Sequence, residues 1–140
     1  MKLEGPYNRY QPLNLFNFDF TFISKNSSIE TLKIHGFQKS RNSLDQISKM
    51  ISKNQSILEL DCEDLIDFSF LKQNKTIQTL RITSIQEFGD SFWYLININN
   101  TINKLILYFV RLKTRGFEKG MIENQSITEL NFIGKEIIFN

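Results

Sequence analysis

The sequence contains few side chains that could act as nucleophiles in catalysis. It has one cysteine, Cys62, and one histidine, His35. A reactive thiol needs a neighbouring base, and a pair such as His35 with Glu63 needs a nucleophile in the same place. The chain has no Gly-rich phosphate loop and no catalytic nucleophile motif, and a lone Cys with a lone His forms neither a disulfide nor a metal cluster. We therefore predict a protein that is not an enzyme and uses no cofactor or metal.

Length and composition are those of one ordinary folded domain. The 140 residues are 41% hydrophobic and 23% charged, with a net charge of +2. That charge is too small to indicate a nucleic acid or an anionic membrane as a partner. Residues 1–12 lack the apolar segment of a secretory signal, and no apolar run is long enough to span a membrane. We therefore expect a cytoplasmic, intracellular protein.

One pattern of nine residues, Asn-x-Ser/Thr-Ile-x-x-Leu-x-apolar, recurs along the chain. Five copies span residues 26–34, 54–62, 74–82, 99–107 and 124–132, and a degenerate copy precedes them at Tyr10, Leu13 and Leu15. Consecutive pattern leucines are 19, 28, 20, 25 and 25 residues apart, at Leu13, Leu32, Leu60, Leu80, Leu105 and Leu130. So many matches in a short chain predict stacked units that share one continuous core.

Each position of the pattern has a physical reason. The Leu-x-apolar pair alternates with period two, which predicts a short strand with both side chains on one face. Asparagine tolerates a left-handed backbone, so we expect it in the turn before the strand. The Ser or Thr can hydrogen-bond nearby backbone in that turn. The same chemistry explains the recurring Asn-x-Ser/Thr sequences better than N-glycosylation does, because no secretory signal accompanies them.

The segments between the strands are predicted to be helical returns. Ser43 is a candidate N-cap for a helix that ends at Lys53 and buries Leu44, Ile47 and Ile51. Asp90 is a candidate cap for a second helix, through Phe92, Leu95 and Ile96, and a third is expected over residues 116–123 with Phe117, Met121 and Ile122 buried. The similar segments 19–25 and 67–73 have room for about one helical turn.

The strand pattern with helical returns resembles the leucine-rich repeat family, and Asn-x-Ser-Ile-x-x-Leu-x-Leu is most similar to its ribonuclease-inhibitor-like subclass. The chain lacks the family's usual Asn soon after each strand, and its 19- and 20-residue units are shorter than typical ones. The resemblance implies an α/β solenoid, a single domain of about six repeats over residues 1–140, the first one degenerate. It also implies a parallel sheet on the concave face, helices or turns on the convex face, and protein binding as the usual role.

Aligning the copies predicts three rows of outward side chains, about 4.8 Å apart from strand to strand. The first row is Thr31, Glu59, Thr79, Lys104 and Glu129; the second is Lys33, Asp61, Arg81, Ile106 and Asn131; the third is His35, Glu63, Thr83, Tyr108 and Ile133. The alternating charges of Lys33, Asp61 and Arg81 fit either a self-paired surface ladder or a polar binding strip.

The later strands place apolar side chains in these outward rows. Ile106, Tyr108 and Ile133 form either a binding site or a surface covered by the C-terminal segment 137–139. Both alternatives remain open at this point. The predicted partner-binding residues are Lys33, Glu59, Asp61, Arg81, Lys104, Ile106, Tyr108, Asn131 and Ile133.

The ends of the array and one basic run complete the functional prediction. Pro6 and Pro12 are candidates for capping the N-terminal end, and the C-terminal edge is either minimally capped or packed on another subunit, in an oligomer or larger complex. We expect a non-catalytic protein–protein interaction module, or else a structural spacer. The basic run Arg111, Lys113, Arg115 and Lys119 keeps a GTPase-activating regulator open as the alternative, because some proteins of the resembled subclass activate small GTPases.

Overall fold

The computed structural model describes residues 1–4, 19–35, 41–63, 67–84, 88–113, 117–118, 121 and 123–138. Its strands are β1 (Lys2–Glu4), β2 (Thr31–His35), β3 (Glu59–Glu63), β4 (Thr79–Ser84), β5 (Lys104–Lys113) and β6 (Glu129–Ile138). Its helices are α1 (Thr21–Lys25), α2 (Arg41–Lys53), the 3₁₀ helix η2 (Phe68–Lys72) and α3 (Asp90–Ile98).

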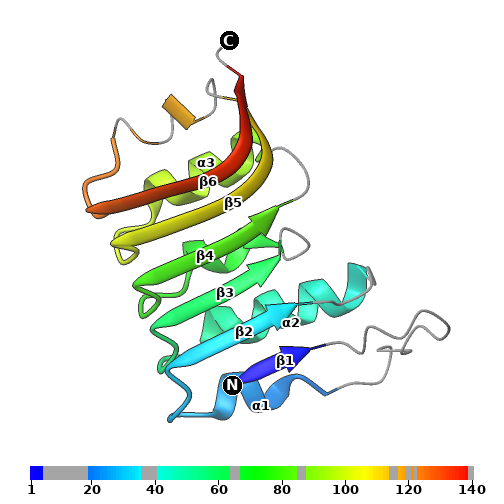
Figure 1. Cartoon of the computed structure of the whole chain (residues 1–140). Helices are drawn as coiled ribbons and strands as arrows, with labels where there is room; N and C mark the ends of the chain where they lie inside the picture. The colour runs from blue at the N-terminus through cyan, green and yellow to red at the C-terminus, as the bar shows by residue number, and fades with distance from the viewer. Residues whose placement is uncertain are drawn as a thin grey trace, which may run out of the picture.

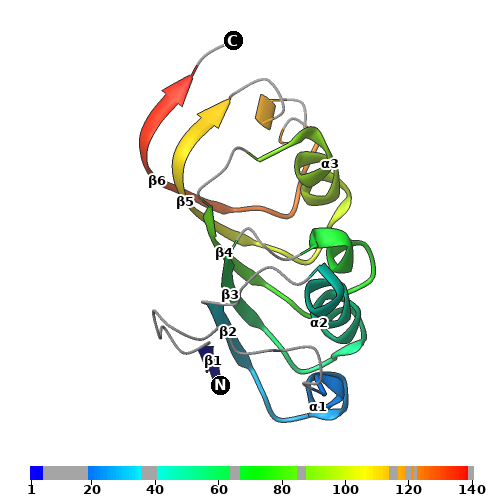
Figure 2. The same cartoon turned by 90° about the vertical axis from the view of Figure 1, so that its right-hand side faces the viewer.

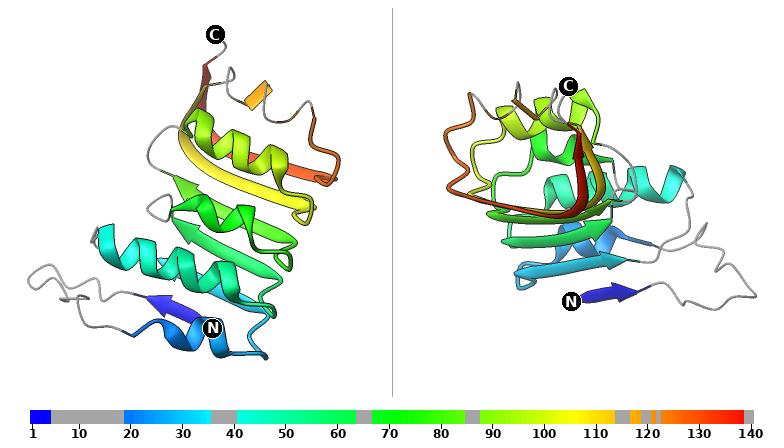
Figure 3. Two further views of the ribbon diagram at one scale, coloured as in Figure 1. Left: turned by 180° about the vertical axis from the view of Figure 1, so that it is seen from behind. Right: turned by 45° about the horizontal axis from the view of Figure 1, so that its top comes forward.

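The protein is α/β, with one six-stranded sheet in the order β1-β2-β3-β4-β5-β6. Every pair of neighbouring strands is parallel. The strands follow one another in chain order (Figure 1). The helices cover one face of the sheet and leave the opposite face free of described helices (Figure 2). The second halves of the long strands β5 and β6 bend away from the other strands, as both views in Figure 3 show.

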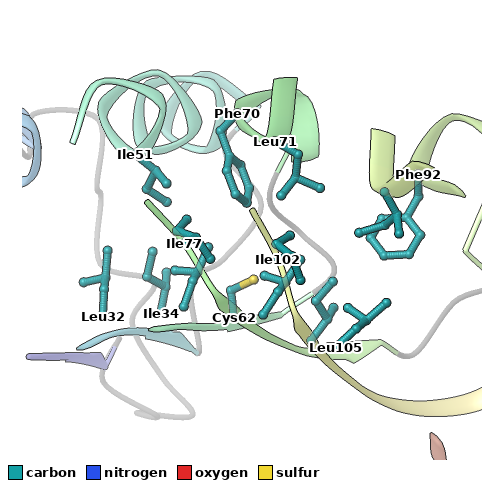
Figure 4. Packing of buried hydrophobic residues seen from close by; sticks show 14 of the residues in the cluster. Leu32, Ile34, Ile51, Cys62, Phe70, Leu71, Ile77, Phe92, Ile102 and Leu105 are labelled. Carbon is teal, nitrogen blue, oxygen red and sulfur yellow. The ribbon is translucent and has the colours of Figure 1, made fainter. Parts of the chain in front are cut away.

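The core lies between the sheet and the helices (Figure 4). The pattern residues Ile, Leu and the following apolar residue point into it, which confirms the period-two prediction for β2 to β5. Those at most 2% exposed are Leu32, Ile34, Ile57, Leu60, Cys62, Ile77, Leu80, Ile82, Ile102, Leu105 and Leu107. A second layer comes from the helices, with Ile47, Ile51, Phe70, Trp93 and Ile96 buried against the same cluster.

Edge-to-face aromatic contacts extend this core toward the C-terminal units. The Trp93 ring lies 5.3 Å from that of Phe117, and Phe117 lies 5.2 Å from Phe132. Phe132 in turn lies 6.0 Å from Phe109. Such tilted pairs suit the ring quadrupoles. They join α3, the segment after β5, and the last two strands into one cluster.

The return segments agree with the predicted helices, but two predicted caps are wrong. α2 begins at Arg41, so Ser43 lies inside the helix rather than at its N-cap. The N-cap of α3 is Gly89, and Asp90 is its first helical residue. A carboxylate in the first turn is still favourable there, because it faces the positive end of the helix dipole. Half of the third helix, expected over residues 116–123, lies outside the described residues, and Phe117 and Met121 pack on the core.

The two short returns share their beginning as well as their length. The Asp19 carboxylate accepts a hydrogen bond from the Thr21 backbone N–H at 2.8 Å, and Asp67 accepts one from Ser69 at 3.0 Å. These bonds satisfy backbone donors that the start of a helical turn leaves unpaired. The bond that Asp19 accepts from Thr21 also lowers the pKa of this carboxyl. The repeated Asp-Phe-Ser/Thr-Phe sequence is therefore a helix-start signal.

The pattern asparagines build a ladder along the turns that precede the strands. The Asn54 side-chain oxygen accepts from the backbone N–H groups of Ser56 and Ile57, at 2.7 and 2.8 Å. Its amide nitrogen donates to the carbonyls of Ile23 and Asn26 in the preceding unit, at 2.6 and 2.9 Å. Asn74 and Asn124 make the same two kinds of bond. The ladder thus links each turn to the one before it.

The predicted reason for asparagine in this turn is wrong. Asn26 and Asn99 have φ values of −77° and −79° with extended ψ, so neither is left-handed. Asparagine is needed because its side chain accepts and donates at once. The Ser56 hydroxyl also reaches further than expected, because its single O–H lies within hydrogen-bonding distance of two carbonyls of the preceding unit, those of Asn26 at 3.0 Å and Ile29 at 2.9 Å.

The first strand differs from the sequence-based prediction. The degenerate copy around Leu13 lies outside the described residues, as do Pro6 and Pro12. The strand beside β2 is β1, formed by Lys2–Glu4, and Lys2 pairs with Lys33. β1 carries no copy of the pattern, so strand pairing alone places it at this edge.

Candidate partner-binding surface

The outward side chains occupy the three rows that the aligned copies predict. The strand register pairs Thr31 with Glu59, Glu59 with Thr79, Thr79 with Lys104, and Lys104 with Glu129. The second row runs in the same way through Lys33, Asp61, Arg81, Ile106 and Asn131. The predicted register is therefore confirmed, and it brings all nine predicted partner-binding residues onto one face of the sheet.

Asp61 is the most enclosed charge on this face. Its side chain is 10% exposed, and its two oxygens contact different neighbours on β2. Oδ1 lies 2.9 Å from His35 Nε2, and Oδ2 lies 3.8 Å from Lys33 Nζ. The other ring nitrogen of His35 lies 3.7 Å from Glu63. The charges at this end of the surface are thus paired with one another, which fits the self-paired ladder for Lys33 and Asp61.

Arg81 and Lys104 pair with acidic residues of the first row. The Arg81 guanidinium lies 3.4 Å from Glu59, while its buried Nε has no hydrogen-bond partner among the described residues. Lys104 Nζ lies 2.8 Å from Glu129, which also accepts from Asn131 at 2.9 Å. The bonds from Lys104 and Asn131 lower the pKa of the Glu129 carboxyl. These pairs are largely exposed, so each contributes little stability.

The apolar members of the rows differ from one another in exposure. Ile106 is 6% exposed although it points outward, Tyr108 is partly buried, and Ile133 is 49% exposed. Tyr108 and Ile133 are register neighbours on β5 and β6. The C-terminal segment does not fold over them as far as Ile138, because it continues β6 and pairs with β5. The covering alternative is therefore wrong for the described residues, and Phe139 lies outside them.

The structure separates the residues that sequence reasoning weighed for catalysis. Cys62 points into the core and is 0% exposed, whereas His35 lies in the outward row and pairs with Asp61. The sheet lies between the two side chains, so His35 is not a base for this thiol. Within the described ranges, no group of three His, Cys, Asp or Glu side chains could hold a metal ion.

The basic run from Arg111 to Lys119 begins inside β5, and the structure describes only part of it. The backbone of Arg111 pairs with that of Glu136 inside the sheet, and that of Lys113 pairs with Ile138. Arg115 and Lys119 lie outside the described residues. The arginine-bearing loop of the GTPase-activating alternative is therefore not described, and Arg111 belongs to a strand.

One surface feature was missed by sequence reasoning. A shallow depression of about 400 Å³ lies along the turns before β3, β4 and β5. Four of its lining residues occupy variable positions of the pattern, which carry no signal of their own in the sequence, and Thr76 and Thr101 occupy the Ser/Thr position. The lining residues are Leu58, Lys75, Thr76, Gln78, Thr101 and Asn103.

Two further observations bear on the class of protein. None of the helices within the described ranges combines the length and the apolar character needed to cross a membrane. Comparisons of the chain with protein-family models, with curated proteins and with solved structures find no significant match.

Proposed function

We propose that this chain is a leucine-rich-repeat solenoid, most similar to the ribonuclease-inhibitor-like subclass, and that it acts as a non-catalytic protein-binding module. The repeated pattern supports the repeat assignment, together with parallel strands in chain order and a side-chain ladder that recurs from unit to unit. In such an array each unit is stabilised mainly by its neighbours. The residues that differ between units are then free to serve binding.

The observation that carries the binding role is that Tyr108 and Ile133 are register neighbours on the outward face. Ile133 is 49% exposed, and Tyr108 is its partly buried register neighbour. Tyrosine is frequent among residues that dominate binding energy, and apolar side chains rimmed by polar ones are typical of interface centres. Thr83, the register neighbour of Tyr108 on β4, and Asn131, two residues before Ile133 on β6, supply polar neighbours of this kind. The partner is accordingly another protein that brings an apolar side chain to this pair.

The test compares two charge-introducing variants in capture experiments from the source cells. Tyr108→Asp combined with Ile133→Asp alters the outward face, and Tyr94→Asp is the matched control on α3, where Tyr94 is 61% exposed. A protein retained by the wild type and the control, but lost from the double variant, supports the proposal. Trp93 is the one tryptophan and is 1% exposed, so its fluorescence reports whether each variant is folded.

Two outcomes contradict this proposal. One is a partner that the folded double variant retains as strongly as the wild type does, because binding then uses another surface. The other is acceleration of GTP hydrolysis by a small GTPase when the chain is added, because this indicates the GTPase-activating alternative. Loss of binding in the Tyr94→Asp control moves the binding surface to the helical face.

A further inference from the structure

The last described strand, β6, is less well covered than the strands before it. It pairs with β5 along one edge, and no described strand lies along its other edge. Its inward residues Leu130 and Phe132 are only partly buried, whereas Leu105 and Leu107 on β5 are 0% exposed. Among the described residues, the core-facing side chains Leu130 and Phe132 are therefore partly open to solvent at this edge.

Each unit donates the same set of hydrogen bonds to backbone carbonyls of the unit before it. In the last described example, the Asn124 amide and the Ser126 hydroxyl both donate to the Asn99 carbonyl, at 3.1 and 3.2 Å. The backbone N–H groups of Thr128 and Glu129 share the Asn103 carbonyl, at 2.9 and 3.0 Å. The earlier units repeat this arrangement. The same pattern of hydrogen bonds is thus repeated at successive interfaces between units; we call it the inter-unit template.

The last described unit contains the carbonyl acceptors of this inter-unit template. By register, the carbonyls of Asn124 and Thr128 stand where those of Asn99 and Asn103 stand one unit earlier. No donor from a following unit meets them among the described residues. The N–H groups of Leu130 and Phe132 point to the free edge, because parallel strands alternate the direction of their backbone groups.

At the opposite edge of the sheet, a short parallel strand lies beside a pattern strand whose inward residues are buried. β1 has three residues, and it joins β2 through Met1 N to Thr31 O at 2.7 Å and Lys33 N to Met1 O at 2.9 Å. Beside it, the β2 residues Leu32 and Ile34 are 0% and 2% exposed. The inward side chains of β2 are thus buried at an edge where one short parallel strand pairs with it.

We propose that β6 accepts a parallel strand from a different polypeptide that carries the Asn-x-Ser/Thr-Ile-x-x-Leu-x-apolar pattern. The inference rests on the proposed function as a protein-binding module and specifies the chemistry of one partner. The pattern supplies the Asn amide and hydroxyl donors that Asn124 and Ile127 would accept, and apolar residues that cover Leu130 and Phe132. A Lys or Arg at the first outward position would face Glu129, as Lys104 does from the other side.

A second copy of this chain fits the edge less well than another polypeptide. In such a copy, the first complete pattern unit contains β2, and β1 already covers the edge of β2. The next copy would therefore present β1, which lacks the Asn turn, to β6. A heterologous contact of that kind also forms an open chain of copies rather than a closed assembly.

The experiment uses the full chain, labelled with ¹⁵N, and a synthetic peptide with the sequence of residues 99–109. This peptide has the complete pattern and places a lysine opposite Glu129. Saturable binding is expected, with slower hydrogen exchange at the amides of Leu130 and Phe132 and no change on β4. Replacing the peptide's asparagine with alanine is expected to weaken binding about tenfold, because a buried hydrogen-bonding group is lost.

Two N-methylated peptides test the strand pairing with unchanged side chains. Methylation at the residues that correspond to Ile106 and Tyr108 blocks the edge that faces β6, and is expected to abolish binding. Methylation at those that correspond to Leu105 and Leu107 blocks the far edge, and binding is expected to persist. Equal affinities of the two peptides overturn strand addition, and an unaffected alanine peptide overturns the requirement for the pattern.

Two other results of the NMR experiment would also overturn the proposed strand addition at β6. Concentration-dependent broadening of the same β6 amides without peptide assigns the edge to a second copy and overturns the inference. Absence of any peptide binding overturns it as well. That result leaves the proposed function standing, because the Tyr108 and Ile133 variants test the outward face independently.

Discussion

The side-chain amide of Asn74 donates to the backbone carbonyl of Asn54 at 3.1 Å, so the pattern residue of one unit holds that of the preceding unit. The same amide donates to Ile51 at 2.9 Å, and the Asn74 oxygen accepts from Thr76 and Ile77. Both ends of one buried side chain are therefore satisfied by backbone. The asparagine acts both within its own turn and between units.

Asn74→Ala is expected to lower the free energy of unfolding by about 2–4 kcal/mol, because it leaves several buried backbone groups without partners. The measurement is chemical denaturation followed by Trp93 fluorescence. Asn26→Ala is the matched control: Asn26 is only half-buried, and its side-chain oxygen accepts within its own turn. We expect a loss of about 1 kcal/mol there. Similar losses at the two positions would contradict the role of the ladder between units.

Gly134 lies under the ring of Phe109, its register neighbour on β5. A Cβ at Gly134 would overlap that ring, so Gly134→Ala must displace Phe109 and, through it, its contact with Phe132. We expect a loss of about 1–3 kcal/mol in the free energy of unfolding, as for other overpacked sites. Gly89→Ala is the control, because a Cβ there meets nothing within 4 Å, and it is expected to cost about 0.5 kcal/mol, since alanine is a poorer N-cap than glycine. Equal effects of the two substitutions would argue against this packing.

Asp61 is expected to be the one acidic residue of the outward rows whose removal measurably affects stability. Asp61→Ala removes the partner of both His35 and Lys33, and we expect a loss of about 1–2 kcal/mol in the free energy of unfolding. Glu59→Ala, at a side chain that is 35% exposed, is expected to stay within about 0.5 kcal/mol of the wild type. Thermal unfolding of both variants checks the order. A larger effect at Glu59 would show that enclosure of Asp61 does not control its contribution.

Lys104→Met is expected to raise the pKa of Glu129 toward its ordinary value, because the bond from Lys104 is the main cause of its lowering. Carboxyl NMR titration measures this change directly. Asp19 is an internal control, since its pKa is lowered by the bond from Thr21 and should not move.

The sign of the corresponding effect on stability follows from linkage. A carboxyl with a lowered pKa in the folded state stabilises it above the ordinary pKa, and this contribution disappears as the pH falls through the folded-state value. Lys104→Met should therefore weaken the acid dependence of unfolding. A stronger acid dependence in the variant would contradict the assignment.

The spacing of the repeated units predicted much of the outward surface correctly. Once Leu32, Leu60, Leu80, Leu105 and Leu130 are aligned, the alternation of a strand places every neighbouring residue on one face or the other. No knowledge of distant contacts is needed, because each unit packs on its neighbour in the same way. The three rows and the buried position of Cys62 follow directly.

The helix starts and the first strand did not follow from the sequence so directly. Ser43 and Asp90 have the side chains of good caps, but the helices begin at Arg41 and Asp90. Cap propensity is a local preference of about 1 kcal/mol, which packing readily overrides. β1 has no pattern at all, and it is placed by pairing with β2 through contacts about thirty residues apart in the chain.

By itself, the sequence determined which residues are scaffold and which face outward, because a short repeat carries its own register. Only the tertiary structure decided how the outward side chains meet. It pairs Asp61 with His35 as well as Lys33, buries Ile106 and leaves Ile133 exposed. It also shows that the pattern asparagines from the second copy onward reach the preceding unit, at Asn54, Asn74, Asn99 and Asn124. These outcomes depend on side-chain rotamers and on strand curvature, which arise from packing against neighbouring units rather than from any one segment.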